Sequence, residues 1–113
     1  MQGESDAGPV LAQGYAKALA RMIAALRRDL NAPQMHAVLA LNQQFGGGKN
    51  ESVPVVAAAQ RSVAEADPLN RWVDSSAATT ANNAHFDAQG ILAVGHWMGA
   101  ALLALETAHS GTN

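Results

Sequence analysis

The sequence predicts an α/β fold in which a short parallel sheet is flanked by three helices. Apolar residues recur at helical spacing in three segments, and two short apolar runs of strand length lie between those segments. The resulting order of helix, strand, helix, strand, helix places a helix between the two strands, which is the connection that parallel strands require. With 113 residues, of which 49% are hydrophobic, the chain is expected to form one domain over residues 1–113.

The first helix is predicted from Leu11 to Leu30. Its larger apolar residues follow steps of mostly three and four, which places them on one face of a helix. They are Leu11, Tyr15, Leu19, Met22, Ile23, Leu26 and Leu30. The helix is expected to end before Pro33, because a proline disfavours the helical conformation in the residue that precedes it.

A strand buried on both faces is predicted from Met35 to Leu41, where a short apolar run lies between Pro33 and a polar, glycine-rich stretch. That stretch, Asn42 to Ser52, is expected to be a mobile loop because three consecutive glycines retain much backbone freedom. Its Gly-Gly-Gly-Lys segment lacks the spacing of a phosphate-binding loop, so a surface loop is the preferred interpretation.

The second helix is predicted from Ser52 to about Ala66. Pro54 falls in its first turn, where the missing N–H of proline costs nothing, and Asp67-Pro68 ends it. A second short strand is expected at Arg71 to Asp74. A loop of small and polar residues, Ser75 to Ala84, then leads to the last helix.

The last helix is predicted to begin with Asp87 as its cap, to run to about Ser110 and to stop at Gly111. Its apolar face consists of Ile91, Leu92, Val94, Met98, Ala101, Leu102 and Leu105. It also contains Gly90, Gly95 and Gly99. Each glycine lowers the helix propensity by up to ~1 kcal/mol relative to alanine, so close packing against the sheet or a neighbouring helix is expected to compensate.

The composition excludes several classes of function. Seven Lys and Arg against nine Asp and Glu give a net charge of -2, which argues against nucleic acid as a partner. The absence of cysteine excludes disulfides, thiolate metal sites and a cysteine nucleophile. His36, His96 and His109 match no metal-ligand spacing, so a metal site is not expected.

A membrane-spanning segment and a signal peptide are not expected. No run reaches the ~18 consecutive apolar residues of a membrane span, and the last helix is interrupted by His96, Glu106 and His109. The first residues are acidic, where a signal peptide would be basic and then apolar. The sequence therefore predicts a soluble protein, cytoplasmic by default.

Two polar segments are candidates for a functional site. They are Gln2 to Asp6 near the start and Asn82 to Asp87 ahead of the last helix. Loops at the carboxyl ends of parallel strands meet at one edge of the sheet, and such folds bind their ligands there. We therefore expect both segments to lie at the same end of the sheet.

These segments resemble the sialate and xylan O-acetylesterase-like branch of the SGNH hydrolases. The similar positions are Gln2-Gly3-Glu4-Ser5-Asp6-Ala7, Tyr15, Leu26 to Leu30, Ala59-Gln60, His85-Phe86, Gly90 and Gly95. The resemblance covers nearly the whole chain and corresponds to the C-terminal part of the family's catalytic domain. It implies a truncated flavodoxin-like sandwich that acts on O-acetyl esters of sugars through a Ser-His-Asp triad, without a cofactor.

The resemblance also assigns roles to individual residues. His85 is similar to the general base, which takes the proton from the serine hydroxyl and later returns one to the leaving alcohol. Gln2, Gly3 and Glu4 are similar to the block that borders the oxyanion hole and shapes the pocket. A polar residue between loop and helix, without a catalytic role, is the alternative interpretation of His85.

Two departures from the family pattern concern the triad itself. The family nucleophile lies in a Gly-Gln-Ser-Asn-like block upstream of the motif with which this chain begins, and none of the six serines stands in a strand-to-helix elbow. The family acid in Asp-x-x-His is Asn82 here, and a comparable Asp→Asn change in a serine protease lowers turnover ~10⁴-fold. Asp87 and Asp74 are possible substitutes, with a helix cap and a strand end as their alternative roles.

The sequence thus predicts a truncated esterase-like domain, related to enzymes that act on acetylated carbohydrate, without independent hydrolase activity. The alternatives are an active acetylesterase subunit completed by another chain, and a structural or interaction domain. A homo-oligomer, with a two-fold dimer favoured, is expected because a two-stranded sheet leaves the Met35 to Leu41 strand as an open edge. Strand pairing or packing of the glycine-containing last helix would cover it.

Overall fold

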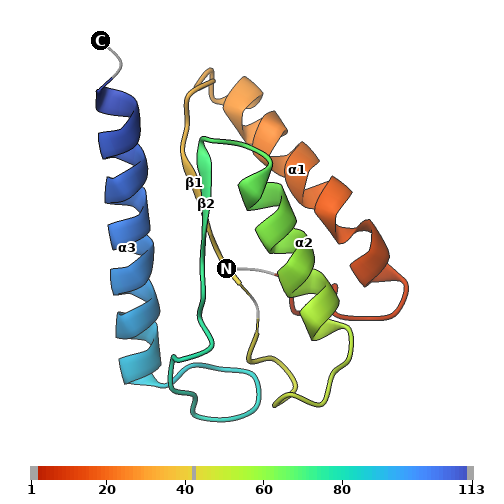
Figure 1. The fold of residues 1–113 in the computed structure, drawn as a ribbon. Helices are drawn as coiled ribbons and strands as arrows, with labels where there is room; N and C mark the ends of the chain where they lie inside the picture. Colours follow the sequence, from red (N-terminus) through yellow and green to blue (C-terminus); the bar gives the residue numbers. More distant parts are fainter. Residues whose placement is uncertain (1–2, 42, 112–113) are drawn as a thin grey trace.

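The computed structural model describes residues 3–41 and 43–111, so the candidate residue Gln2 lies outside the described residues. The fold is α/β, with three helices and a two-stranded parallel sheet. The elements in chain order are α1 (Leu11–Asp29), β1 (Ala37–Ala40), α2 (Val53–Glu65), β2 (Asn70–Val73) and α3 (Ala88–Ser110). Figure 1 shows α1 and α2 on one side of the sheet and α3 alone on the other, so the molecule has three layers.

The parallel pairing of the two strands confirms the prediction from the order of the elements. Ala37 lies opposite Asn70 and Ala40 opposite Val73. The first strand is shorter than the predicted Met35 to Leu41, and only Ala40 within it is buried. The rest of β1 is partly exposed because β2 covers one of its edges and no strand of the described chain pairs with the other.

Two hydrophobic clusters lie on opposite faces of the sheet. The cluster under α1 and α2 contains the buried residues Ala12, Tyr15, Leu19, Ile23, Val56 and Val63. The cluster under α3 contains Ala40, Ala78 and Val94, with Phe86, Trp97 and Met98 packed against it. Ala37 and Leu39 contact the first cluster and Ala40 belongs to the second, as the alternation of side chains along a strand requires.

Arg27 joins the end of α1 to the starts of both strands. Its Nε donates to the Met35 carbonyl oxygen at 2.9 Å, and its two terminal nitrogens donate to Asp67 Oδ2 at 2.5 Å and to Asn70 Oδ1 at 2.9 Å. Burial acts to raise the pKa of the Asp67 carboxyl, but hydrogen bonds from Arg27 and from the Leu69 N–H outweigh it and hold the pKa below its usual value.

The helix ends agree with the predicted ranges to within about one residue, and α3 ends at Ser110 with Gly111 after it, as predicted. Ser52 precedes α2 without a side-chain cap, and the φ of Gly111 is −84°, outside the left-handed region. The predicted cap of α3 is confirmed, because the Asp87 side chain accepts a hydrogen bond from the Gly90 N–H at 2.8 Å.

Of the three glycines of α3, Gly90 alone is closely packed within the described part of the chain. A Cβ at Gly90 would lie 2.0 Å from the Thr79 carbonyl oxygen, so this glycine is required. At Gly95 and Gly99 nothing lies within 4 Å of an added Cβ. These two glycines face away from the chain's own sheet.

The predicted apolar face of α3 is likewise divided by the structure. Val94 and Leu105 are buried against the sheet, whereas Ile91 is 61% and Leu92 65% exposed. A sheet of two strands is narrow, so it covers one stripe of the helix and leaves the rest of the apolar residues outside. By length and composition alone, α3 would also suffice to cross a membrane.

Candidate functional site

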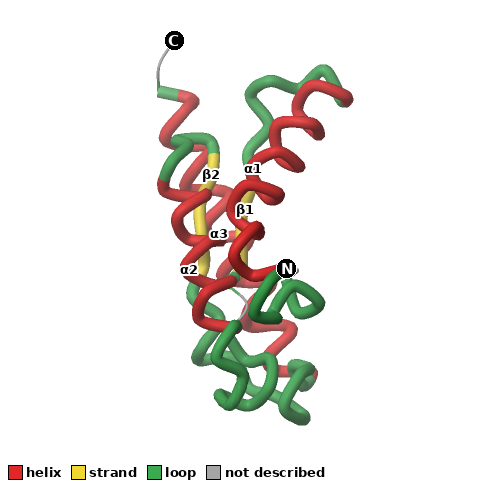
Figure 2. Tube along the Cα trace, turned by 90° about the vertical axis from the view of Figure 1, so that its right-hand side faces the viewer, coloured by secondary structure: helices red, strands yellow, loops and turns green. Residues whose placement is uncertain are grey.

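Three loops meet at the end of the molecule where the strands end: residues 3–10 before α1, residues 43–52 after β1, and residues 74–87 between β2 and α3. The loop after β1, residues 43–52, contacts the other two: the Asn50 Nδ2 donates to the Ala7 carbonyl oxygen at 3.0 Å, and the Gly46 N–H donates to the Asn83 carbonyl oxygen at 2.7 Å. Most of the loop backbone lies at this end of the molecule in Figure 2. The described parts of the two predicted polar segments, residues 3–6 and 82–87, therefore lie at the same end, with the 43–52 loop between them.

The glycine run gives this connecting loop a defined path. Gly46, Gly47 and Gly48 have φ values of 80°, 58° and 78°, in the region that glycine adopts most readily. A Cβ at Gly47 would lie 2.9 Å from both Cγ and Oδ1 of Asn83. The stretch predicted as a mobile surface loop is thus packed against the loop that carries Asn82 and His85.

Gly3 is buried in a niche between α1 and α2. Its φ is +124°, and a Cβ there would lie 2.8 Å from Val56 Cγ1 and 3.2 Å from the Tyr15 hydroxyl oxygen. That hydroxyl accepts a hydrogen bond from Gln60 Nε2 at 3.1 Å. Burial raises the pKa of Tyr15, against the opposing effect of the Gln60 hydrogen bond. These contacts explain why glycine, Tyr15 and Gln60 occur together in the sequence pattern.

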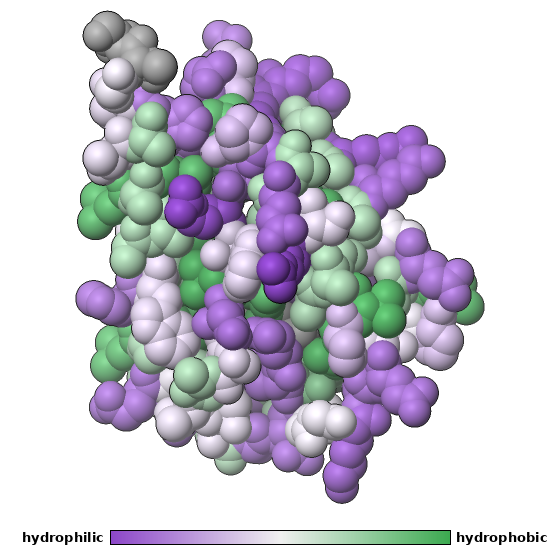
Figure 3. Space-filling model, viewed as in Figure 1, coloured by the Kyte–Doolittle hydropathy of each residue, from purple (hydrophilic) through white to green (hydrophobic). Residues whose placement is uncertain are grey.

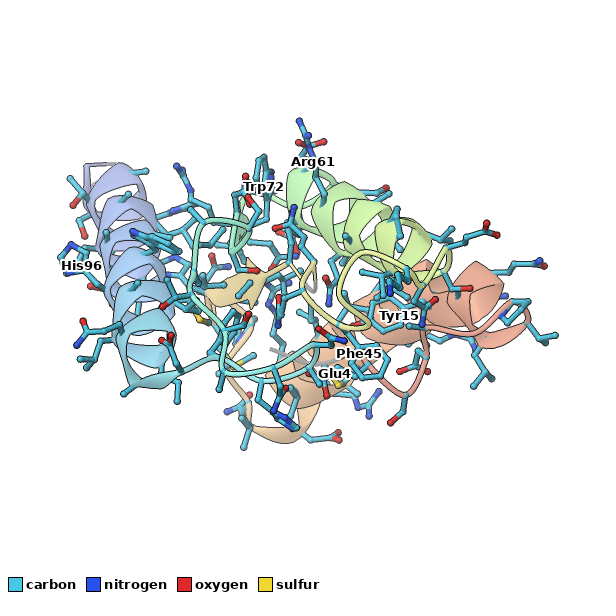
Figure 4. All side chains as sticks on the ribbon, turned by 90° about the horizontal axis from the view of Figure 1, so that it is seen from below. Glu4, Tyr15, Phe45, Arg61, Trp72 and His96 are labelled. Carbon is cyan, nitrogen blue, oxygen red and sulfur yellow. The ribbon has the colours of Figure 1, made fainter. Side chains whose placement is uncertain are left out.

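Glu4 stands exposed beyond this niche, at the end of the molecule that faces the viewer in Figure 4. Its carbonyl oxygen accepts from the Ala7 N–H at 3.2 Å, and the Gly3 carbonyl oxygen accepts from the Asp6 N–H at the same distance. Within residues 3–41 and 43–111, no ion pair or hydrogen bond joins the Glu4 side chain to His85. The backbone turn, rather than a side-chain contact, sets the position of Glu4.

Asn82 and His85 contact one another directly. The Asn82 Oδ1 accepts from the N–H groups of Ala84 and His85, both at 2.9 Å, and it lies 3.2 Å from His85 Nδ1. Because two backbone donors point at this atom, it is the amide oxygen and not the nitrogen. In the neutral imidazole, a hydrogen bond to this oxygen requires the proton on Nδ1 and leaves Nε2 unprotonated.

A short hairpin-like turn supports this pair. Thr80 and Phe86 form an antiparallel bridge, and the Ala81 N–H donates to the His85 carbonyl oxygen at 3.0 Å. Phe86 packs against the cluster beneath α3, whereas Asn82 and His85 are exposed. The turn is thereby anchored through its flanks and presents His85 to solvent.

Asp87 caps the start of α3. Its Oδ1 accepts from the Thr79 hydroxyl at 2.6 Å and from the Gly90 N–H at 2.8 Å. These hydrogen bonds, that from Thr79 above all, lower the pKa of the Asp87 carboxyl. The helix-cap role that the sequence offered as an alternative is the one that Asp87 has.

The Asp74 carboxylate accepts hydrogen bonds within the turn after β2. Its Oδ1 accepts from the Ser76 N–H at 2.8 Å, and hydrogen bonds from the side chain and backbone of Ser76, with a smaller contribution from Gln43, lower the pKa of its carboxyl. Its partners therefore lie in its own turn and in the loop after β1.

Ser75 has a structural role that sequence reasoning missed. It is fully buried, its Oγ donates to the Leu41 carbonyl oxygen at 2.5 Å, and its N–H donates to Gln43 Oε1 at 3.1 Å. These bonds hold the loop after β2 to the loop after β1. Ser5 and Ser76, by contrast, are exposed in turns. The sequence signal that could have indicated this role is a polar residue directly after the predicted strand Arg71 to Asp74.

A pocket of 510 Å³ lies beside these loops, between the strand ends and the first turns of α2. It is lined by Leu41, Gln43, Val53, Pro54, Ala57, Ala58, Arg61 and Ser76. Neither Glu4 nor His85 contributes to its wall. Among the residues whose positions are described, no group of three or more His, Asp or Glu side chains is arranged to hold a metal ion.

An α/β fold with its polar loops at the carboxyl ends of parallel strands belongs to the class of proteins that bind ligands at that edge. The family model of carbohydrate esterases described as sialic acid-specific acetylesterase matches residues 1–104. The chain therefore belongs to this family, and the resemblance to SGNH-type carbohydrate O-acetylesterases is confirmed. No curated protein and no solved structure matches it.

Proposed function

We propose that the chain supplies the histidine side of a carbohydrate O-acetylesterase site, with His85 as the general base. The observation that carries this proposal is the contact of Asn82 Oδ1 with His85 Nδ1, which leaves Nε2 as a proton acceptor. A base in a serine esterase must present such a nitrogen to the nucleophile. Family membership supports O-acetyl esters of sialic acid-type sugars as the substrate class.

Asn82 is the positioning residue in this proposal. Its amide oxygen fixes the tautomer and the orientation of the imidazole, as the carboxylate of a triad does. A neutral amide gives the imidazolium less electrostatic stabilisation than a carboxylate, so the base works at reduced efficiency. Gly3 and Glu4, with Gln2 before them, are proposed to border the pocket for the acyl group.

We also infer that the serine nucleophile is contributed by polypeptide outside these 113 residues. Ser75 is buried and donates its hydroxyl proton to a carbonyl oxygen, and the carboxylates of Asp74 and Asp87 accept hydrogen bonds from Ser76 and from Thr79 and Gly90. Helices on both faces of a parallel sheet support a flavodoxin-like sandwich as the architecture of the complete site. The isolated chain is then a hydrolase-related domain without independent hydrolysis.

The test is hydrolysis of 4-nitrophenyl acetate and of an O-acetylated sialic acid by the purified 113-residue chain. We expect the rate to equal that of the His85→Ala variant, at the uncatalysed background. A rate that is abolished by His85→Ala and retained by His96→Ala, a change of an exposed histidine on α3, would contradict the inference that the nucleophile lies outside these residues. Single replacements of Ser5 and Ser76 would then identify the serine that had taken over.

A further inference from the structure

The outer face of α3 is apolar over most of its length. Four large residues on it are exposed: Ile91 at 61%, Leu92 at 65%, Leu102 at 39% and Leu103 at 64%. No Asp, Glu, Lys or Arg occurs between residues 88 and 105. Figure 3 shows hydrophobic side chains along the edge of the molecule that α3 forms. Monomeric proteins rarely leave large apolar residues gathered in this way, so the face requires a partner.

The apolar residues of this face are arranged symmetrically along the helix about position 97. Gly95 and Gly99 lie two residues to either side of that position, Leu92 and Leu102 five, and Ile91 and Leu103 six. On a helix with about 100° between successive residues, all six fall within an arc of about 120° on the side away from the sheet. This face therefore presents the same order of large apolar residues and glycines in both chain directions.

We infer that this face, defined by Ile91, Leu92, Gly95, Gly99, Leu102 and Leu103, binds the same face of a second copy of the chain, with the two α3 helices antiparallel. A two-fold interface uses one patch on both partners and requires that patch to be complementary to itself. In an antiparallel pair, Ile91 of each copy lies against Leu103 of the other, and Leu92 against Leu102. Gly95 and Gly99 meet at the crossing, where no Cβ holds the backbones apart.

The structure favours a second copy over a lipid surface as the occupant. A helix that lies on a membrane carries lysine and arginine beside its apolar face, and α3 has neither. The opposite side of α3 is packed on the sheet through Val94 and Leu105, so lipid cannot surround the helix without removing it from the fold. Gly95 and Gly99 lower the stability of an isolated helix, but the absence of a Cβ allows two helices to approach closely.

The first test measures mass in solution by sedimentation equilibrium at micromolar concentration. We expect twice the chain mass of 11.7 kDa for the wild type and the single-chain mass for Leu103→Glu. Leu30→Glu is the matched control, because Leu30 is also 64% exposed but lies at the end of α1. It should remain dimeric. A monomeric wild type, or a dimer that Leu103→Glu leaves intact, would overturn the inference; the intact dimer would direct attention to the open edge of β1.

The second test determines the orientation of the helices in a chain that contains no other cysteine. A Leu92→Cys/Leu102→Cys double variant should form a disulfide-linked dimer on oxidation, and each single variant should not. In the antiparallel pair, equivalent positions 92 lie about 15 Å apart along the axis, beyond the reach of a disulfide. Cross-linking of the single variants would show a parallel pair and overturn the inference. So would a wild type that is monomeric in buffer and binds phosphatidylcholine vesicles through this face.

Discussion

Replacement of Gly90 by alanine tests the packing that places the His85 loop on α3. A Cβ at this position would lie 2.0 Å from the Thr79 carbonyl oxygen and 3.2 Å from Phe86 Cβ. The first of these contacts is with backbone, which cannot rotate away as a side chain does. The same Thr79 oxygen accepts the Asp87 N–H at 3.2 Å, so a displacement also disturbs the start of the helix.

Two opposing effects determine the magnitude for Gly90→Ala. Overpacking in a well-packed region costs about 1–3 kcal/mol, and the clash with backbone places this case at the upper end. Alanine gains about 1 kcal/mol of helix propensity over glycine. The free energy of unfolding should therefore fall by about 2 kcal/mol. Gly14→Ala is the control, because nothing lies within 4 Å of a Cβ in that exposed position of α1; it should raise the free energy by up to about 1 kcal/mol.

The assay is urea denaturation followed by circular dichroism and by tryptophan fluorescence, at one protein concentration for all variants. The two alanine variants should differ by about 3 kcal/mol, in opposite directions from the wild type. Equal stabilisation by Gly90→Ala and Gly14→Ala would refute the close contact between α3 and the 79–80 segment. The position of His85 would then need another explanation.

Three further changes test other parts of the structure. Gly3→Ala should lower the free energy of unfolding by about 2 kcal/mol in the same assay, because φ is +124° and the niche is full; an unchanged value would contradict the niche. Ser75→Ala should cost about 1–3 kcal/mol, because the Leu41 carbonyl oxygen loses a buried donor, and urea midpoints equal to wild type would argue against that bond. The lowered pKa of Asp67 stabilises the fold above its unfolded pKa, near pH 4, and this stabilisation is lost as the pH falls through the lower folded value. Stability of Asp67→Asn between about pH 5 and pH 2 should thus fall less steeply than that of the wild type, and parallel curves would contradict the pairing with Arg27.

The regular elements were predictable because local patterns determine them. Apolar residues at helical spacing located α1 and α3 to within about a residue, and Asp87 indicated its cap through a side chain that acts on its own helix. Parallel pairing followed from the order of the elements. The strand lengths were less accurate, because β1 loses regular pairing where β2 ends and not where its apolar run ends.

The parts that escaped prediction depend on contacts between segments distant in sequence. The glycine loop acquires its path from Asn83, and the buried Ser75 finds its acceptor at Leu41, more than thirty residues earlier. The spacing of the apolar residues of α3 also predicted a single apolar face packed against the sheet or a neighbouring helix. How much of that face a sheet covers depends on the number of strands, which periodicity does not reveal.

The protonation state of the His85 ring is the most direct test of the proposed base. Long-range ¹H–¹⁵N correlation spectra of the ¹⁵N-labelled chain, recorded where the imidazole is neutral, distinguish the two tautomers. The contact with Asn82 Oδ1 predicts the proton on Nδ1 in the wild type, and Asn82→Ala should remove that preference. A wild-type ring with its proton on Nε2 would contradict the account, because the unprotonated nitrogen would then be Nδ1 beside Asn82, and Nε2 could not accept the proton of a serine.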